Sequence, residues 1–241
     1  MQKEIKIKAH DGKVIYGTLT VAKKPAEKLI IFVHGMTSSS YEPKYYNAAR
    51  FFRGKGFNSF FFEQYPGGKE RARRFIDTTT SIHALDLEAV ITFFKKKYKK
   101  LYLITHSWGG PVALLADWSA VAAVVLWDPS VDYKFKEGKS FSFDKRIDAY
   151  LSDWGVQTVI GKEWVAGARA LPDPENLGAR ASKPTKIISA KVGNGHKAKR
   201  LMKNMQVPTA YHYMAKASHN FPEWGAEEEL FKETLDWLKR W

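Results

Sequence analysis

The sequence contains no cysteine among its 241 residues. This absence excludes disulfide bonds, thiolate nucleophiles and cysteine-ligated zinc or iron–sulfur centres. Long hydrophobic runs are also lacking, because the longest, residues 120–127, is far too short to span a bilayer. The first eight residues alternate charged with apolar side chains and carry no hydrophobic signal region. The sequence therefore predicts a soluble, cytoplasmic protein without a membrane partner.

Acidic residues are few relative to basic ones, 25 against 39, which gives a net charge of +14. Such an excess fits binding to nucleic acid, but no nucleic-acid-binding motif accompanies it. The densest basic run, residues 95–100, closes a predicted helix, where cations favour the C-terminal end of the helix dipole. We expect a lysine-rich solvated surface of the kind common in thermophiles, and no specific nucleic-acid partner. No metal-ligand spacing occurs, so we expect neither a metal nor another cofactor.

Short apolar runs alternate with amphipathic segments along the chain. This alternation predicts a mostly parallel sheet with helices on both faces, and the length suits one large domain. The strands are expected at residues 4–9, 13–21, 29–33, 57–62, 101–105, 121–126, 185–190 and 209–214, and the helices at 81–98, 109–118, around 196–204 and at 227–241.

One stretch, between Pro129 and Lys183, interrupts this alternation of strands and helices. It has about fifty residues, too many for an ordinary connection, and it is rich in aromatic side chains. We expect a core formed by residues 1–129 and 184–241, with residues 130–183 inserted as a lid over a pocket. The residues expected to line that pocket are Tyr41, Trp154 and Trp164.

The segment 101–111, LYLITHSWGGP, joins a predicted buried strand to a predicted helix through a single serine and two glycines. The pattern G-x-S-x-G forms a sharp strand-to-helix turn that exposes a nucleophilic serine. Here Thr105 takes the first small position and Gly109 keeps the second. Ser107 is thus the predicted nucleophile, although a serine at such a turn can also serve only as a helix cap.

The sequence resembles the α/β-hydrolase superfamily along its whole length, and the resemblance rests on four blocks. The first is the turn around Ser107, and the second is FVHGM at 32–36, which resembles the oxyanion loop. The third is WDP at 127–129, at the end of the sixth strand, and the fourth is ASHNF at 217–221, which resembles the loop of the catalytic histidine.

The resemblance implies a twisted, mostly parallel sheet of eight strands with helices on both faces. It also implies an oxyanion hole formed by the backbone N–H groups of Met36 and Trp108. His219 is the implied general base, since it follows the nucleophile and the acid in the chain order that this fold uses.

The sequence leaves two alternatives for the acidic position of the triad, because the region after the seventh strand, residues 188–195, has no carboxylate. One alternative is Asp128, after the sixth strand, since both strand ends open on the same edge of the sheet. An Asp-Pro pair is also a common turn starter. In the other alternative the acid is lost and Asn194 only orients His219.

A serine, a histidine and a carboxylate beside an oxyanion hole transfer acyl groups to water. The sequence predicts a carboxylesterase that acts through an acyl-enzyme on small, apolar or aromatic esters, and its insertion loosely resembles the lid of feruloyl-type esterases. Two alternatives stay open: a serine hydrolase that cleaves amides or thioesters, and a catalytically degenerate hydrolase used for binding. The expected oligomeric state is a monomer or a homodimer.

Overall fold

The computed structural model describes residues 1–22, 26–131, 135–153 and 157–241. Its centre is an eight-stranded sheet in the order β1-β2-β4-β3-β5-β6-β10-β11, in which β1, β2 and β4 pair antiparallel and the remaining neighbours pair parallel. The expected mostly parallel, eight-stranded sheet is confirmed. Its strands are β1 (Gln2–Lys8), β2 (Val14–Thr20), β3 (Lys28–Val33), β4 (Asn58–Glu63), β5 (Lys100–His106), β6 (Val121–Trp127), β10 (Thr185–Val192) and β11 (Thr209–Ser218).

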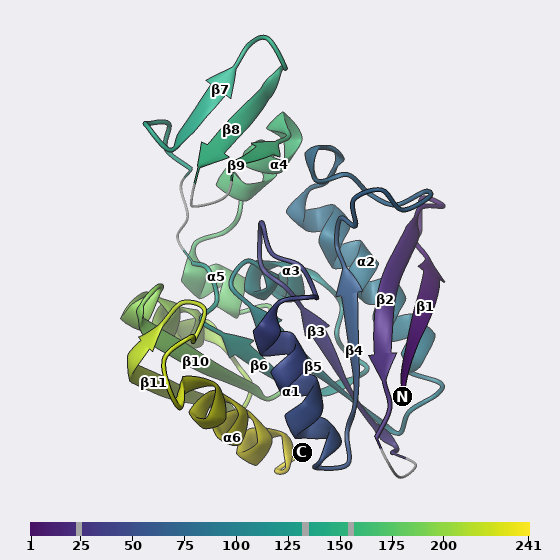
Figure 1. Ribbon diagram of the computed structural model, residues 1–241. Helices are drawn as coiled ribbons and strands as arrows, with labels where there is room; N and C mark the ends of the chain where they lie inside the picture. Colours follow the sequence, from purple (N-terminus) through teal and green to yellow (C-terminus); the bar gives the residue numbers. More distant parts are fainter. Residues whose placement is uncertain (23–25, 132–134, 154–156) are drawn as a thin grey trace.

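Helices cover both faces of this sheet (Figure 1). One face carries α1 (Pro43–Arg53) and α6 (Ala226–Leu238), whose apolar residues share one core cluster. The other face carries α2 (Thr80–Phe94) and α3 (Gly109–Leu115), which belong to the second core cluster. Two segments are 3-10 helices, η1 (Phe75–Asp77) and η2 (Gly195–Asn204), and the second of these stands where the sequence predicted a helix.

The central strands are largely apolar because both of their faces are covered. Successive side chains of a strand point to opposite faces. In β3, Leu29, Ile31 and Val33 accordingly join the cluster beneath α2 and α3, whereas Ile30 and Phe32 join the cluster beneath α1 and α6. The strands are therefore fixed from two sides, and their carboxyl ends form a rigid edge.

No helix in the described part of the chain is long and apolar enough to cross a membrane.

The described residues between β6 and β10 form a further unit of secondary structure at this edge. An antiparallel sheet of β7 (Phe141–Asp144), β8 (Ala149–Asp153) and β9 (Gln157–Ile160) precedes α4 (Lys162–Arg169) and α5 (Pro174–Gly178). This small sheet projects away from the body of the molecule (Figure 1). The division into a core and a lid stays a prediction.

The base of this unit, by contrast, is firmly packed on the core. The Trp164 side chain in α4 is fully buried, and its ring centroid lies 4.9 Å from that of Trp108 and 5.1 Å from that of Phe135. A Cβ atom at Gly161 would lie 2.1 Å from the Ile76 carbonyl oxygen, so the two backbones are in direct contact. The start of α4 is thus held against η1 and against the residue that follows Ser107.

Trp164→Ala should lower the free energy of unfolding by about 3–5 kcal/mol, because it removes a large buried ring and leaves a cavity. Urea unfolding followed by circular dichroism measures this change. The matched control is Trp224→Ala, since the Trp224 side chain is fully exposed and its loss should change stability by about 0.5 kcal/mol or less. Equal losses in the two variants would contradict the packing described for α4.

Candidate active site

Ser107 occupies a strained turn between β5 and α3. Its φ angle is 55°, a left-handed conformation that costs a non-glycine residue about 1–2 kcal/mol. Hydrogen bonds hold it there: its N–H donates to the Trp127 carbonyl at 3.0 Å, and its carbonyl accepts from Gly110 N–H at 3.0 Å and from Ser130 N–H at 2.9 Å. These contacts fix the serine backbone to the end of β6.

Two glycines let the neighbouring backbones reach this turn. A Cβ atom at Gly109 would lie 2.5 Å from the Val33 carbonyl oxygen, and one at Gly35 would lie 2.8 Å from the Ser107 Cβ. The loop after β3 therefore lies directly against Ser107. Thr105, which replaces the first small residue of the motif, remains within β5 opposite Val33 and Leu126, where a β-branched side chain is well tolerated.

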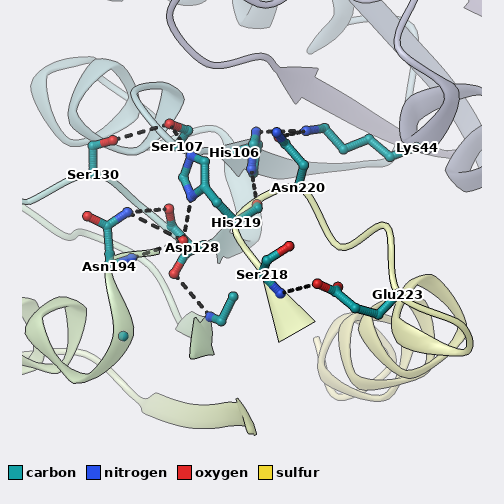
Figure 2. A network of polar contacts seen from close by, with 12 residues as sticks. Lys44, His106, Ser107, Asp128, Ser130, Asn194, Ser218, His219, Asn220 and Glu223 are labelled. Carbon is teal, nitrogen blue, oxygen red and sulfur yellow. Dashed lines mark hydrogen bonds and ion pairs between the residues drawn. The ribbon is translucent and has the colours of Figure 1, made fainter. Parts of the chain in front are cut away.

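His219 and Asp128 extend from Ser107 in one line of hydrogen bonds (Figure 2). His219 lies in the loop after β11, and its Nε2 is 2.8 Å from the Ser107 Oγ. Its Nδ1 is 2.5 Å from Oδ2 of Asp128, the completely buried residue that follows β6. The carboxylate accepts a hydrogen bond from Nδ1–H, which leaves Nε2 as an acceptor for the serine hydroxyl.

The end of β10 and the loop after it stabilise the Asp128 carboxylate with backbone groups. Oδ1 accepts from Ala190 N–H at 3.1 Å, and Oδ2 accepts from Asn194 N–H at 3.2 Å. The Asn194 side chain donates to the Asp128 carbonyl at 3.0 Å. A Cβ atom at Gly193 would lie 2.2 Å from Oδ2, so only glycine fits there. Of the two residues considered for the acid position, Asp128 makes the contact to the His219 ring, and Asn194 contacts Asp128.

A cavity of about 470 Å³ opens above Ser107. Both residues predicted for the oxyanion hole, Met36 and Trp108, line it, together with Phe135. The rest of its wall is largely polar and includes Thr37, Ser38, Ser130, Asn194 and Asn220. The Glu42 carboxylate also lines the cavity, so the site combines an apolar side with hydrogen-bonding groups of which one is charged. Among the described residues, no three histidine, aspartate or glutamate side chains gather to hold a metal ion.

Two of the three residues predicted to line the pocket, Tyr41 and Trp164, lie elsewhere. Tyr41 is 75% exposed and lines a different cavity, beside Tyr16 and Tyr65. Trp164 is buried behind Trp108, where it supports the wall of the cavity and does not form its surface. The aromatic content of the insertion was visible in the sequence, but the burial of individual rings was not. Trp154 falls outside the described residues.

Sequence reasoning missed a buried lysine behind His219. Lys44 of α1 places its Nζ 2.8 Å from Glu42 Oε2, 2.9 Å from Asn220 Oδ1 and 3.1 Å from His106 Nδ1. Burial lowers the Lys44 pKa, and the Glu42 carboxylate opposes this shift. His106 in turn donates from Nε2 to the His219 carbonyl at 2.8 Å. Nothing in the sequence pattern marks Lys44, because a lysine on a helix is usually solvated.

The turn, the loop after β3 and the histidine loop define an α/β-hydrolase, in which the carboxyl ends of the strands carry the site. The chain belongs to the family described as serine aminopeptidase, S33, whose model matches residues 24–220. Comparison with curated proteins gives no match.

Solved structures share the fold at low sequence identity. Est1E from Butyrivibrio proteoclasticus, solved with ferulic acid bound, is 19% identical with a TM-score of 0.81, and the match covers 98% of this chain and 99% of that one. The α/β hydrolase GrgF from Penicillium sp. sh18 is 16% identical with a TM-score of 0.81, covering 100% and 98%. An esterase of Pyrococcus furiosus is 19% identical with a TM-score of 0.73, covering 100% and 91%.

Three histidines near the site are buried and are kept neutral by their surroundings. Burial lowers the pKa of His34 and of His106, and it lowers the pKa of His83 from its ordinary 6.5 to about 3. The unfolded chain therefore binds a proton at position 83 between pH 6.5 and about 3 that the folded chain does not bind. Stability must then fall as the pH falls through this window.

His83→Phe should flatten this dependence. Between pH 6 and pH 4, the slope of the unfolding free energy against pH should decrease by up to about 1.4 kcal/mol per pH unit relative to the unmodified protein. Urea unfolding at a series of pH values measures the slope, which is informative even if the variant is uniformly less stable. The control is His10→Gln at an exposed position. An unchanged slope in His83→Phe would contradict the assigned shift.

Proposed function

We propose that this protein is a serine ester hydrolase in which Ser107 is the nucleophile, His219 the general base and Asp128 the acid of the triad. The observation that carries the proposal is the unbroken line of contacts from the Ser107 hydroxyl through both ring nitrogens of His219 to a buried carboxylate, at the base of a cavity. The family and the esterase folds it resembles support a hydrolase.

The reaction begins when His219 Nε2 takes the Ser107 proton as the serine oxygen attacks the ester carbonyl. Asp128 keeps the imidazole in the required tautomer and stabilises the imidazolium that forms. The negative oxygen of the tetrahedral intermediate is assigned to the N–H groups of Met36 and Trp108. His219 then protonates the departing alcohol, and a water activated by the same imidazole hydrolyses the acyl-enzyme.

The size and lining of the cavity favour small esters. About 470 Å³ lies within the usual range for small-molecule sites. Met36, Trp108 and Phe135 offer an apolar contact for an acyl or aryl group, and the ferulic acid bound to Est1E is an aromatic acid of this kind. The insertion that supplies Phe135 and supports Trp108 is the proposed lid.

An aminopeptidase is the second candidate, because the family description names one. Such an enzyme needs a carboxylate that is available to bind the ammonium group of its substrate. Glu42 lines the cavity, but the Lys44 ammonium and the Ser38 hydroxyl already bind its carboxylate. This arrangement favours the ester hydrolase over the peptidase.

Ser107→Ala should abolish ester hydrolysis and labelling by a fluorophosphonate probe, since both need the hydroxyl nucleophile.

Asp128→Asn should keep the fold and lower kcat by about 10⁴-fold, because the wrong tautomer of His219 is then favoured. Stopped-flow or spectrophotometric assays with p-nitrophenyl esters measure both effects. A wild-type protein that neither reacts with the probe nor turns over esters would be a binding protein and would refute the proposal.

A panel of chromogenic substrates tests the substrate class. Acetyl, butyryl and benzoyl esters should be hydrolysed with higher kcat/KM than esters of acyl chains with twelve or more carbons, which exceed the cavity. Aminoacyl p-nitroanilides should be hydrolysed slowly or not at all. Higher kcat/KM on the anilides than on the short esters would favour the aminopeptidase instead.

A further inference from the structure

A second hydroxyl lies beside the nucleophile. The Ser130 Oγ is 3.2 Å from the Ser107 Oγ, on the side away from His219 (Figure 2). Ser130 is only 7% exposed and follows Asp128 by two residues, so the segment that supplies the acid also supplies this hydroxyl. The reaction outlined above gives it no role.

The neighbouring contacts determine which hydroxyl donates. His219 Nδ1 faces the Asp128 carboxylate and carries the ring proton, so Nε2 is the acceptor of the Ser107 proton. The hydroxyl hydrogen of Ser107 therefore forms the hydrogen bond to His219 Nε2. The hydrogen bond between the two serines must then be donated by Ser130 to the Ser107 Oγ.

The backbone holds this donor in place before any substrate binds. Ser130 N–H donates to the Ser107 carbonyl at 2.9 Å. A Cβ atom at Gly110 would lie 2.7 Å from the Pro129 Cβ, so the segment before Ser130 packs closely on the first turn of α3. A donor that is fixed toward a reacting oxygen needs no reorganisation during the reaction.

We propose that Ser130 is a further catalytic residue, whose hydroxyl stabilises the Ser107 oxygen as it leaves the acyl group during deacylation; this rests on the proposed function. In that step water adds to the acyl carbon and gives a proton to His219 Nε2. The bond between the acyl carbon and Oγ then breaks, its electron pair goes to Oγ, and His219 returns the proton to Oγ. Ser130 keeps its own proton and donates a hydrogen bond throughout.

The contribution should be larger in deacylation than in acylation. During acylation Oγ is the attacking atom, and a hydrogen bond donated to it withdraws electron density from the attacking lone pair. During deacylation Oγ is the leaving atom, where negative charge accumulates, and a donor to a charged acceptor is at its strongest. A role in substrate binding alone would instead alter KM.

The experiment is pre-steady-state hydrolysis of p-nitrophenyl acetate by wild type and by Ser130→Ala. The burst of p-nitrophenol reports acylation, and the linear phase that follows reports deacylation. In Ser130→Ala, the deacylation rate should fall about 10- to 100-fold, the magnitude of one hydrogen bond to a charged group. The burst rate and the rate of fluorophosphonate labelling should stay within about three-fold of wild type.

Two further variants keep the test decisive if Ser130→Ala does not fold. Ser130→Thr retains the hydroxyl and should deacylate at nearly the wild-type rate, whereas Ser130→Cys has a similar shape but a weak donor and should deacylate more slowly. Equal slowing of both phases, a change in KM alone, or equal rates in the Thr and Cys variants would overturn the role of Ser130. Absence of labelling and of a burst in the wild type would overturn the proposed function itself.

Discussion

The buried carboxylate of Asp128 is the contact on which the site depends. It lies at the end of β6 and accepts hydrogen bonds from two N–H groups, one at the end of β10 and one in the loop after it. It also accepts a hydrogen bond from the His219 ring, which lies in the loop after β11. Three parallel strands are thus joined at their carboxyl ends through one side chain. An unpaired carboxylate at a completely buried position would be strongly unfavourable, so these partners are as necessary to the fold as to the chemistry.

Backbone contacts, rather than side-chain packing, set the position of Ser107. The left-handed turn at Ser107 is held by hydrogen bonds to residues 110, 127 and 130, and the loop after β3 approaches it across Gly35. Behind His219, Lys44 and His106 bind the loop that carries the ring. Ser107, Asp128 and His219 therefore come from separate segments, each attached to the end of a strand.

Local patterns in the sequence were sufficient to predict the fold and to select candidate residues at the strand ends. The apolar runs predicted the central strands because a sheet covered on both faces requires them. The turn motif and the chain order pointed to Ser107 and His219, which the structure brings within 2.8 Å of each other. Ser130 and Lys44 could not be found in this way, because their importance comes from tertiary contacts and not from spacing. For the same reason, the aromatic residues Tyr41 and Trp164 were assigned to the wrong surfaces.

The packing of α4 has a consequence for how substitutions around it can reach Ser107. The projecting sheet of β7, β8 and β9 is connected to the core through a helix whose buried tryptophan rests on Trp108, the neighbour of Ser107. Substitutions at the tip of the projecting sheet leave this joint untouched, whereas a substitution of Trp164 changes the packing beside Ser107.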